Sequence, residues 1–523
     1  MSRARNATRN IVFGILLRIY QIFIPFLMRT AMIYLMGVEY LGLNSLFSSV
    51  LQVLNLAELG VGSAMVYSMY KPIAQKNKTE ICALLKLYKR YYFLIGLIIA
   101  IIGCAITPFI PRLIKGEIPG SLNVYVLYLL NLSATVLTYW LFAYKNSLLQ
   151  AHERNDLSSK VMLITNTIQY VLQLLVLWIF HNYYYYIIVM LLTTTLSNII
   201  TAVVASKYYP EYVAVGELPK SQKKEINRKI RDLFTAKLGS TVVNSADTIV
   251  ISTFLGLTVL AIYQNYYFIM SSVVNIISII FASCLAGIGN SLIKENIQKN
   301  YMDFRIITLF INMIVTVCMA CFATMYQPFI TLWVGHNFTF ENSFVWLLCI
   351  YFYLVVMQQI PGMYKDAAGV WHQDRYRPLI ASAVNLILNI VLVKYWGIYA
   401  IVLSTIVSYL TVAVPWLIAN LFHYVFSRDW KDYVVDMIKY FICTLIITSL
   451  CYVTCMLTSG LTVIMQLILN GLISVVCSST LWILVYRKSR YFKAMIKLVD
   501  RVTHKKIQPL LFKLLPNSER NEI

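Results

Sequence analysis

The sequence carries very little charge for its length. Of its 523 residues only 13% are Asp, Glu, Lys or Arg, whereas 59% are hydrophobic. A soluble domain carries about a quarter charged residues, so this chain could not cover a water-facing surface. The sequence also lacks the alternating ten-residue segments of outer-membrane barrels. We therefore predict an all-α integral membrane protein.

Sequence signatures of catalysis are missing as well. The chain has no Gly-x4-Gly-Lys-Ser/Thr loop for nucleotide phosphates and no His-Glu-x-x-His zinc motif. It also has no Asp-rich loop of the kind that a metal-dependent sugar transferase would need. We expect no catalytic residue, no metal and no cofactor, and the chain is not predicted to be an enzyme.

What the sequence does contain is a series of apolar runs of about 20 residues or more, the length that crosses the hydrocarbon core as a helix. They predict about 14 transmembrane helices. The first run is too long for a signal-peptide core, so we expect it to be retained. The predicted ranges are 11–36, 41–69, 88–110, 122–144, 161–181, 183–206, 233–255, 259–290, 305–330, 343–364, 378–396, 398–421, 436–457 and 462–486.

The net charge of +22 has an uneven distribution along the chain. Of the 44 Lys and Arg, 39 fall in alternate connections, beginning with the N-terminal segment. By the positive-inside rule both termini are then cytoplasmic. This placement argues against nucleic acid as a partner and favours anionic phospholipids. The basic connection 207–232 is expected to be a solvated loop drawn to their headgroups.

Two short segments recur in both halves of the chain. Gly37-Val-Glu-Tyr-Leu-Gly-Leu resembles Gly256-Leu-Thr-Val-Leu-Ala-Ile, and Gly60-Val-Gly resembles Gly287-Ile-Gly. A shift of six helices preserves orientation, so the repeat would be parallel, with a transport site between the halves near the midplane. The predicted organisation is a six-helix lobe at 1–206, a cytoplasmic linker at 207–232, a six-helix lobe at 233–424, two additional helices at 425–486, and a basic tail at 487–523 that can form an amphipathic helix.

Polar residues within the apolar runs are rare and costly, so each is a candidate functional residue. They follow helical spacing on the first two predicted helices of each half, and two such stripes would form a hydrated cleft. Arginine suits a phosphate or diphosphate, whereas Asn and Gln suit sugar hydroxyls. Glu58 and Asp247 are candidates for a coupling ion; a structural ion pair of Glu58 with Arg18 or Arg29 is the alternative. The candidate substrate-binding residues are Arg18, Arg29, Gln52, Asn55, Asn244, Gln264 and Asn275.

Several segments carry a family resemblance. Gly37-Val-Glu-Tyr-Leu-Gly-Leu-Asn44, Ala57-Glu58-Leu-Gly60-Val-Gly62-Ser-Ala64, Asp366-Ala-Ala-Gly369-Val-Trp371 and the stretch 385–398 are similar to the bacterial Wzx-type polysaccharide flippases. These proteins belong to the multidrug/oligosaccharidyl-lipid/polysaccharide exporter (MOP) superfamily. The likeness covers about 8–490 and includes the six-plus-six-plus-two arrangement of helices.

The resemblance implies a multi-pass protein of the bacterial inner membrane. Its cargo would be an undecaprenyl-diphosphate-linked oligosaccharide repeat unit, moved to the outer leaflet for O-antigen or capsule synthesis. Arg18 and Arg29 would then hold the diphosphate, and Glu58 or Asp247 would take a coupling H⁺ or Na⁺. Polysaccharide polymerase or assembly proteins are further expected partners.

Three other functions stay open at this stage. A cation-coupled multidrug exporter of the same superfamily would need a cavity dominated by acids. The candidate residues here are roughly balanced in charge, with Arg18 and Arg29 against Glu58 and Asp247. A membrane polymerase or ligase would need a long external loop, and the predicted external loops are short. A flippase for a lipid-linked peptidoglycan precursor would differ only in cargo.

Overall fold

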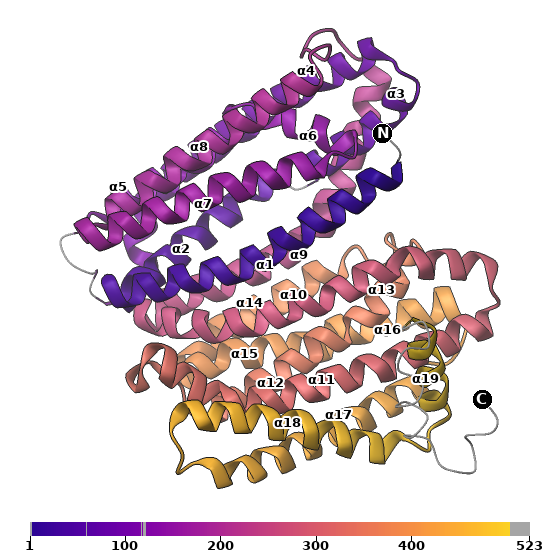
Figure 1. Cartoon of the computed structure of the whole chain (residues 1–523). Helices are drawn as coiled ribbons and strands as arrows, with labels where there is room; N and C mark the ends of the chain where they lie inside the picture. Colours follow the sequence, from indigo (N-terminus) through magenta and orange to yellow (C-terminus); the bar gives the residue numbers. More distant parts are fainter. Residues whose placement is uncertain (1–2, 59, 117, 119–121, 503–523) are drawn as a thin grey trace. The chain divides into compact units, whose positions relative to one another are not determined.

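The computed structural model describes residues 3–58, 60–116, 118 and 122–502, with the side chains of 3–16, 18, 57, 232–233, 235–244 and 497–502 left out. The described chain is helical throughout, without strands, which confirms the predicted class. It forms two compact units (Figure 1). Unit 1 comprises residues 1–264 with 386–398, and unit 2 comprises 265–385 with 399–523. The predicted lobes and additional helices stay a prediction.

Long helices make up unit 1, which also contains the beginning of α10 and the end of α14. Its elements are α1 (Arg3–Leu35), α2 (Val38–Leu54), the 3-10 turn η1 (Asn55–Glu58), α3 (Val61–Ala74), α4 (Lys78–Ile106), η2 (Thr107–Leu113), α5 (Val124–Trp140), α6 (Tyr144–Ala151), α7 (Asn155–Phe180), α8 (Tyr183–Tyr208) and α9 (Lys220–Phe254).

Unit 2 holds the remaining helices. They are most of α10 (Leu257–Lys294), α11 (Ile297–Val334), α12 (Asn342–Met357), α13 (Gln359–Ala367), the start of α14 (Arg377–Trp396), α15 (Ile398–Ser408), α16 (Val414–Leu421), α17 (Lys431–Cys455), α18 (Val463–Tyr486) and α19 (Arg490–Val502). The short turns between them are helical too: η3 (His336–Phe338), η4 (Tyr409–Ala413), η5 (Phe422–Phe426) and η6 (Met456–Thr458).

Helices account for most of each predicted range, but not all of these helices meet the criteria for a membrane span. In the described part of the chain, ten helices are long and apolar enough, or eleven if the bent pair α5 and α6 is one crossing. The apolar part of α1, Ile19–Leu35, is shorter, the second predicted span is broken, and α9 begins with a strongly polar segment. The protein is a multi-pass membrane protein; the number of fourteen crossings and the side of the termini stay predictions.

The second predicted helix, 41–69, is interrupted where the sequence suggested one continuous polar face. After Leu54 the chain tightens into η1, and Gly60 has φ +89°, a left-handed conformation that glycine adopts at little cost. Gly37 and Gly256 both have positive φ at the turns that precede α2 and α10, so the first pair of recurring segments shares a backbone conformation.

In the second pair, Gly60 is in a turn whereas Gly287 lies within the continuous helix α10, so these two segments differ in conformation.

The basic connection after α8 is not a loop over most of its length. Residues 220–231 form the first turns of α9, and three contacts hold the segment against α3 and α4. Gln222 donates a hydrogen bond to Glu80 at 3.1 Å. Tyr91 donates one to Asn227 at 2.6 Å, and the Lys229 ammonium lies 4.8 Å from the Tyr67 ring centroid. The expectation of a solvated loop was wrong because α9 extends well beyond its apolar part.

The apolar residues predicted for an amphipathic tail are covered by the protein itself. Tyr491, Phe492, Met495 and Ile496 on α19 are buried in one hydrophobic cluster with residues of α11, α17 and α18.

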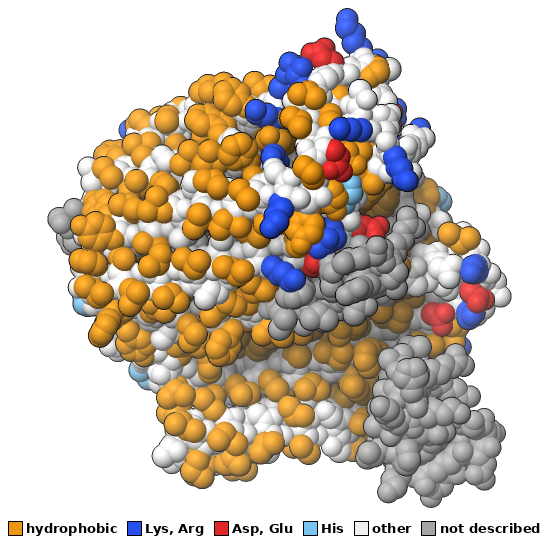
Figure 2. All heavy atoms as spheres, turned by 45° about the horizontal axis from the view of Figure 1, so that its top comes forward, with side chains coloured by type: hydrophobic (Ala, Val, Ile, Leu, Met, Phe, Trp, Pro, Cys, Tyr) orange, Lys and Arg blue, Asp and Glu red, His pale blue; other side chains and the backbone are white. Residues whose placement is uncertain are grey.

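Charged and hydrophobic side chains are separated on the described surface. Figure 2 shows Lys and Arg side chains gathered in one region and hydrophobic side chains covering the flank of the helices, as a lipid-facing surface requires.

A buried charge network joins α13 and α14 in unit 2. Asp374, only 4% exposed, accepts two hydrogen bonds from Arg377, at 2.7 and 2.9 Å, and one from Lys365 at 3.0 Å. Burial raises the pKa of the Asp374 carboxyl, but the hydrogen bonds and positive charges of Arg377 and Lys365 outweigh burial and hold the pKa below its ordinary value.

Asp374→Asn should destabilise the protein by about 3 kcal/mol, because it removes the buried carboxylate that accepts from Arg377 and Lys365 and leaves Lys365 with Asp366 alone. The wild-type contribution is fully present above the unfolded pKa of about 4 and is lost as pH falls through the lower folded pKa. Thermal unfolding of both proteins at several pH values measures this. Asp429→Asn, at an exposed carboxylate near Lys431, is the control and should leave the melting temperature unchanged. Equal melting temperatures for wild type and Asp374→Asn would contradict the role of the network.

Close packing at Gly42 gives a second prediction. A Cβ there would overlap the carbonyl oxygen of Leu257 and lie 2.9 Å from its carbonyl carbon. Gly42→Ala should therefore cost about 1–3 kcal/mol of stability. In α18 a Cβ at Gly471 would meet Met325 at an ordinary 3.5 Å, so Gly471→Ala should be neutral or stabilising. Melting temperatures that fall equally for both variants would contradict this packing.

Candidate functional site

Glu58 is the centre of a tyrosine cluster in unit 1. The Tyr92 hydroxyl on α4 donates to Glu58 Oε1 at 2.5 Å, and the Tyr139 hydroxyl on α5 donates to Oε2 at 2.8 Å. Tyr88 donates in turn to the Tyr92 hydroxyl at 2.8 Å. The Tyr139 hydroxyl also lies 3.1 Å from Oδ1 of Asn55. Two phenol protons therefore satisfy one half-buried carboxylate.

The elements around Glu58 explain why these groups meet. The break at η1 turns the end of α2 so that Asn55 and Glu58 lie next to α4 and α5. On α4, Tyr88 and Tyr92 are four residues apart and so share one face of the helix. In a helix that continued through residue 60, the Glu58 side chain would point in a different direction from the helix axis. The break between α2 and α3 is therefore part of the site.

A polar cavity of about 390 Å³ opens beside the carboxylate. Among the described residues that line it, Glu58 is the one charged residue; tyrosines, small hydroxyl side chains and amides make up most of the rest. Such a cavity offers one exchangeable negative charge surrounded by neutral oxygens, which suits a proton or a small hard cation. The non-tyrosine polar lining residues are Ser63, Thr138, Asn146, Ser147, Gln150 and Asn198.

A second polar cluster lies along α9. Ser245 donates to Gln52 of α2 at 3.2 Å. Asn389 of α14 donates to the Asp247 carboxylate at 2.6 Å, and Gln264 of α10 donates to the Thr248 hydroxyl at 3.0 Å. The three α9 side chains are all buried. Within unit 1, α9 therefore makes polar contacts with three other helices over a single turn.

The predicted site residues divide into three groups. Gln52, Asn55, Glu58, Asp247 and Gln264 all take part in these two clusters, and Gln52 is itself exposed. Arg29 is half-buried on α1, within electrostatic range of the Tyr186 hydroxyl on α8, and Asn275 is exposed on α10 in unit 2. The side chains of Arg18 and Asn244 lie outside the described residues.

Among the described residues the hydrogen-bond partners of Glu58 are Tyr92 and Tyr139, and no ion pair joins it to Arg29. The alternative ion pair with Arg18 stays a prediction, because the Arg18 side chain lies outside the described residues. Sequence reasoning missed both tyrosines, as well as Tyr88 and Asn389. The spacing of Tyr88 and Tyr92 was a usable signal, but the chain has 38 tyrosines and nothing local distinguishes this pair.

Comparison with known proteins defines the fold. No protein-family model matches the sequence, and no curated protein matches it either. Solved structures do: the chain has the fold of the MOP superfamily of membrane transporters. The family resemblance of the sequence had predicted this fold.

Two kinds of transporter stand among the similar structures. A lipid II flippase, MurJ in an inward closed conformation, is similar with a TM-score of 0.65 and 15% identity, over 91% of this chain and 99% of that one. An inward-facing multidrug resistance MATE transporter has a TM-score of 0.60 and 14% identity over 77% and 97%. A point mutant of the Vibrio cholerae MATE transporter VcmN has a TM-score of 0.54 and 16% identity over 80% and 96%.

The tyrosine cluster predicts a difference between two buried tyrosines of the same helix. Tyr139→Phe removes the hydroxyl that bonds to Glu58 and Asn55, and should cost about 1–2 kcal/mol of stability. Tyr128, also on α5, has a buried hydroxyl without a partner among the described residues, so Tyr128→Phe should be neutral or stabilising. Melting temperatures of the purified variants test this, and a larger loss for Tyr128→Phe would contradict the assignment.

Proposed function

We propose that this protein flips a polyprenyl-diphosphate-linked oligosaccharide from the cytoplasmic to the outer leaflet of the bacterial inner membrane, for polysaccharide synthesis. The observation that carries the proposal is the extent of the similarity. The lipid II flippase corresponds to the chain over 91% of its length, whereas the two MATE transporters correspond over 77% and 80%. The Wzx-like segments of the sequence favour a polysaccharide repeat unit over a peptidoglycan precursor as cargo.

The energetics of the cargo support a dedicated carrier. Moving a single charge through the bilayer centre costs from about 2.5 to more than 10 kcal/mol. A diphosphate with attached sugars costs more, so unassisted flipping would be negligible. In the proposed mechanism Arg18 and Arg29 hold the diphosphate, because a guanidinium offers paired, charge-assisted hydrogen bonds. The sugar hydroxyls are bound by Gln52, Asn55, Asn244, Gln264 and Asn275.

Glu58 is the stronger of the two candidates for the coupling ion. It lines a polar cavity through which H⁺ or Na⁺ could reach it, and its two tyrosine partners can remain hydrogen-bonded in either charge state. Asp247 is 7% exposed and bonded to a buried amide. A coupling ion that binds at Glu58 in one conformation and leaves in the other would shift the balance between them.

Glu58→Gln should lower the flipping rate about tenfold or more and remove its dependence on the cation gradient. The assay uses full-length protein in vesicles that contain labelled lipid-linked oligosaccharide. Glu217→Gln, at a carboxylate that is 65% exposed, is the matched control and should flip normally. Arg29→Ala with unchanged transport at normal protein levels would remove Arg29 from the mechanism.

A deletion experiment tests the function itself. In a host that makes a lipid-linked capsule or O-antigen unit, loss of this protein should leave the labelled lipid on the cytoplasmic leaflet and abolish the surface polymer. Normal transfer to the outer leaflet without polymer would instead indicate a polymerase or ligase. Normal polymer together with increased drug sensitivity would indicate a multidrug exporter.

A further inference from the structure

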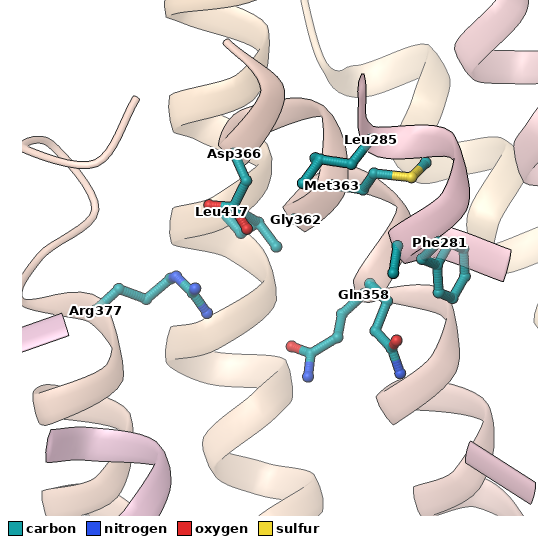
Figure 3. A pocket seen from close by; sticks show the side chains of 10 residues that line it. Phe281, Leu285, Gln358, Gly362, Met363, Asp366, Arg377 and Leu417 are labelled. Carbon is teal, nitrogen blue, oxygen red and sulfur yellow. The ribbon is translucent and has the colours of Figure 1, made fainter. Parts of the chain in front are cut away.

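Unit 2 contains a cavity of about 330 Å³ that is separate from the Glu58 cluster. It lies where α13 begins, between α10, α14 and α16, and it falls at the small end of the range for ligand pockets. Figure 3 shows the Arg377 side chain extending toward the space between Asp366 and Gln358. None of its lining residues was among those predicted from the sequence.

The polar side of the cavity is formed where a membrane-spanning helix loses a backbone hydrogen bond. α12 ends at Met357 and α13 begins at Gln359 within one span, Asn342–Ala367, and Pro361 has no N–H to donate to the carbonyl of Met357. Gly362 leaves room on the next turn, because a Cβ there would meet nothing within 4 Å.

The carboxamide of Gln358 has no hydrogen-bond partner among the described residues, although its Oε1 is buried. Gln359, by contrast, accepts a hydrogen bond from Ser278 at 2.8 Å. A buried amide oxygen without a partner has lost its hydrogen bonds to water, so a ligand that supplies a donor there binds more tightly. On the opposite wall, the Arg377 guanidinium donates from Nε and Nη2 to Asp374, which leaves Nη1 to donate to a ligand.

The charges around the cavity balance. Arg377 and Lys365 are matched by Asp366 and Asp374, and each cation lies within 3.0 Å of a carboxylate oxygen. A diphosphate would need an excess of positive charge, and a cationic drug would need an excess of negative charge. The remaining walls are apolar, from Phe281, Leu285, Met363 and Leu417. An uncharged ligand with both hydroxyl groups and an apolar face fits this combination.

We propose that this cavity is a subsite for one neutral sugar ring of the lipid-linked oligosaccharide. The ring hydroxyls donate to Gln358 Oε1 and Asp366 and accept from Arg377 Nη1 and the Gln358 amide, while the C–H face packs against Phe281 and Leu285. The cavity has room for a sugar ring with its substituents but not for a whole oligosaccharide. This subsite rests on the proposed function, because it takes the cargo to be a lipid-linked oligosaccharide whose diphosphate and lipid are held elsewhere.

The test measures how tightly purified full-length protein binds three probes: undecaprenyl diphosphate alone, the same lipid with one N-acetylhexosamine, and the same lipid with one hexuronic acid. Wild type should bind the neutral-sugar lipid about tenfold more tightly than the sugar-free lipid, as two or so neutral hydrogen bonds allow. Gln358→Leu should remove this advantage and leave binding of the sugar-free lipid unchanged. Gln466→Leu, on α18 and away from the lining of the cavity, should retain it.

A second variant tests the space rather than the hydrogen bonds. Gly362→Leu fills the cavity without removing a polar group, and it should also abolish the preference for the neutral sugar. Retention of that preference in both Gln358→Leu and Gly362→Leu, with melting temperatures like wild type, would overturn the subsite and leave the flippase standing. Tighter binding of the hexuronic acid lipid would overturn the neutral class of ligand. Failure of wild type to bind any of the three lipids would overturn the proposed function and the subsite with it.

Discussion

Inside the hydrocarbon a polar group has no water to bond, and this constraint accounts for most of the described structure. The backbone meets it by forming helices. Polar side chains meet it by bonding to another helix or by lining a hydrated cavity. Ser245, Asp247 and Thr248 each bond to a different helix of unit 1, so one turn of α9 links three other helices by polar contacts.

Glu58 and Asp247, the two acids of unit 1 that were predicted as candidates for a coupling ion, meet this constraint in different ways. Glu58 accepts hydrogen bonds from two tyrosine hydroxyls and borders a cavity of about 390 Å³ that can hold an ion. Asp247 accepts from a carboxamide and is nearly inaccessible. A carboxylate in the first environment is suited to repeated binding and release. One in the second environment is suited to holding helices together, or to binding only after α9 and α14 move apart.

The sequence predicted the all-helical membrane class and most of the helix ranges, because apolar runs of sufficient length have few other structures available to them. It also identified Asn55 and Glu58 as related residues. It did not predict that η1 and Gly60 break the helix around them, since a single glycine within an apolar run is compatible with a continuous helix. Tyr92 and Tyr139 could not be assigned to Glu58 because they come from other helices, 34 and 81 residues away in sequence.

Sequence patterns also failed where a polar segment and an apolar one belong to the same element. Residues 220–231 were predicted as a loop because a hydropathy pattern identifies membrane-spanning segments, and it does not show that a polar segment continues the same helix. The apolar stripe of α19 suggested a membrane-bound surface, whereas the cluster formed with α11, α17 and α18 covers it. Periodicity shows that a helix has an apolar face; it does not show whether lipid or protein covers that face.

The length of α9 has a mechanical consequence. Its 35 residues span roughly 50 Å, well beyond a hydrocarbon core of about 30 Å. One continuous helix therefore carries Asp247 in its apolar part and, at its other end, the basic turns that contact Glu80 and Tyr91. If α9 turns about its axis as one body, both ends turn together, and a spectroscopic label on the basic end would report on movement of the buried carboxylate.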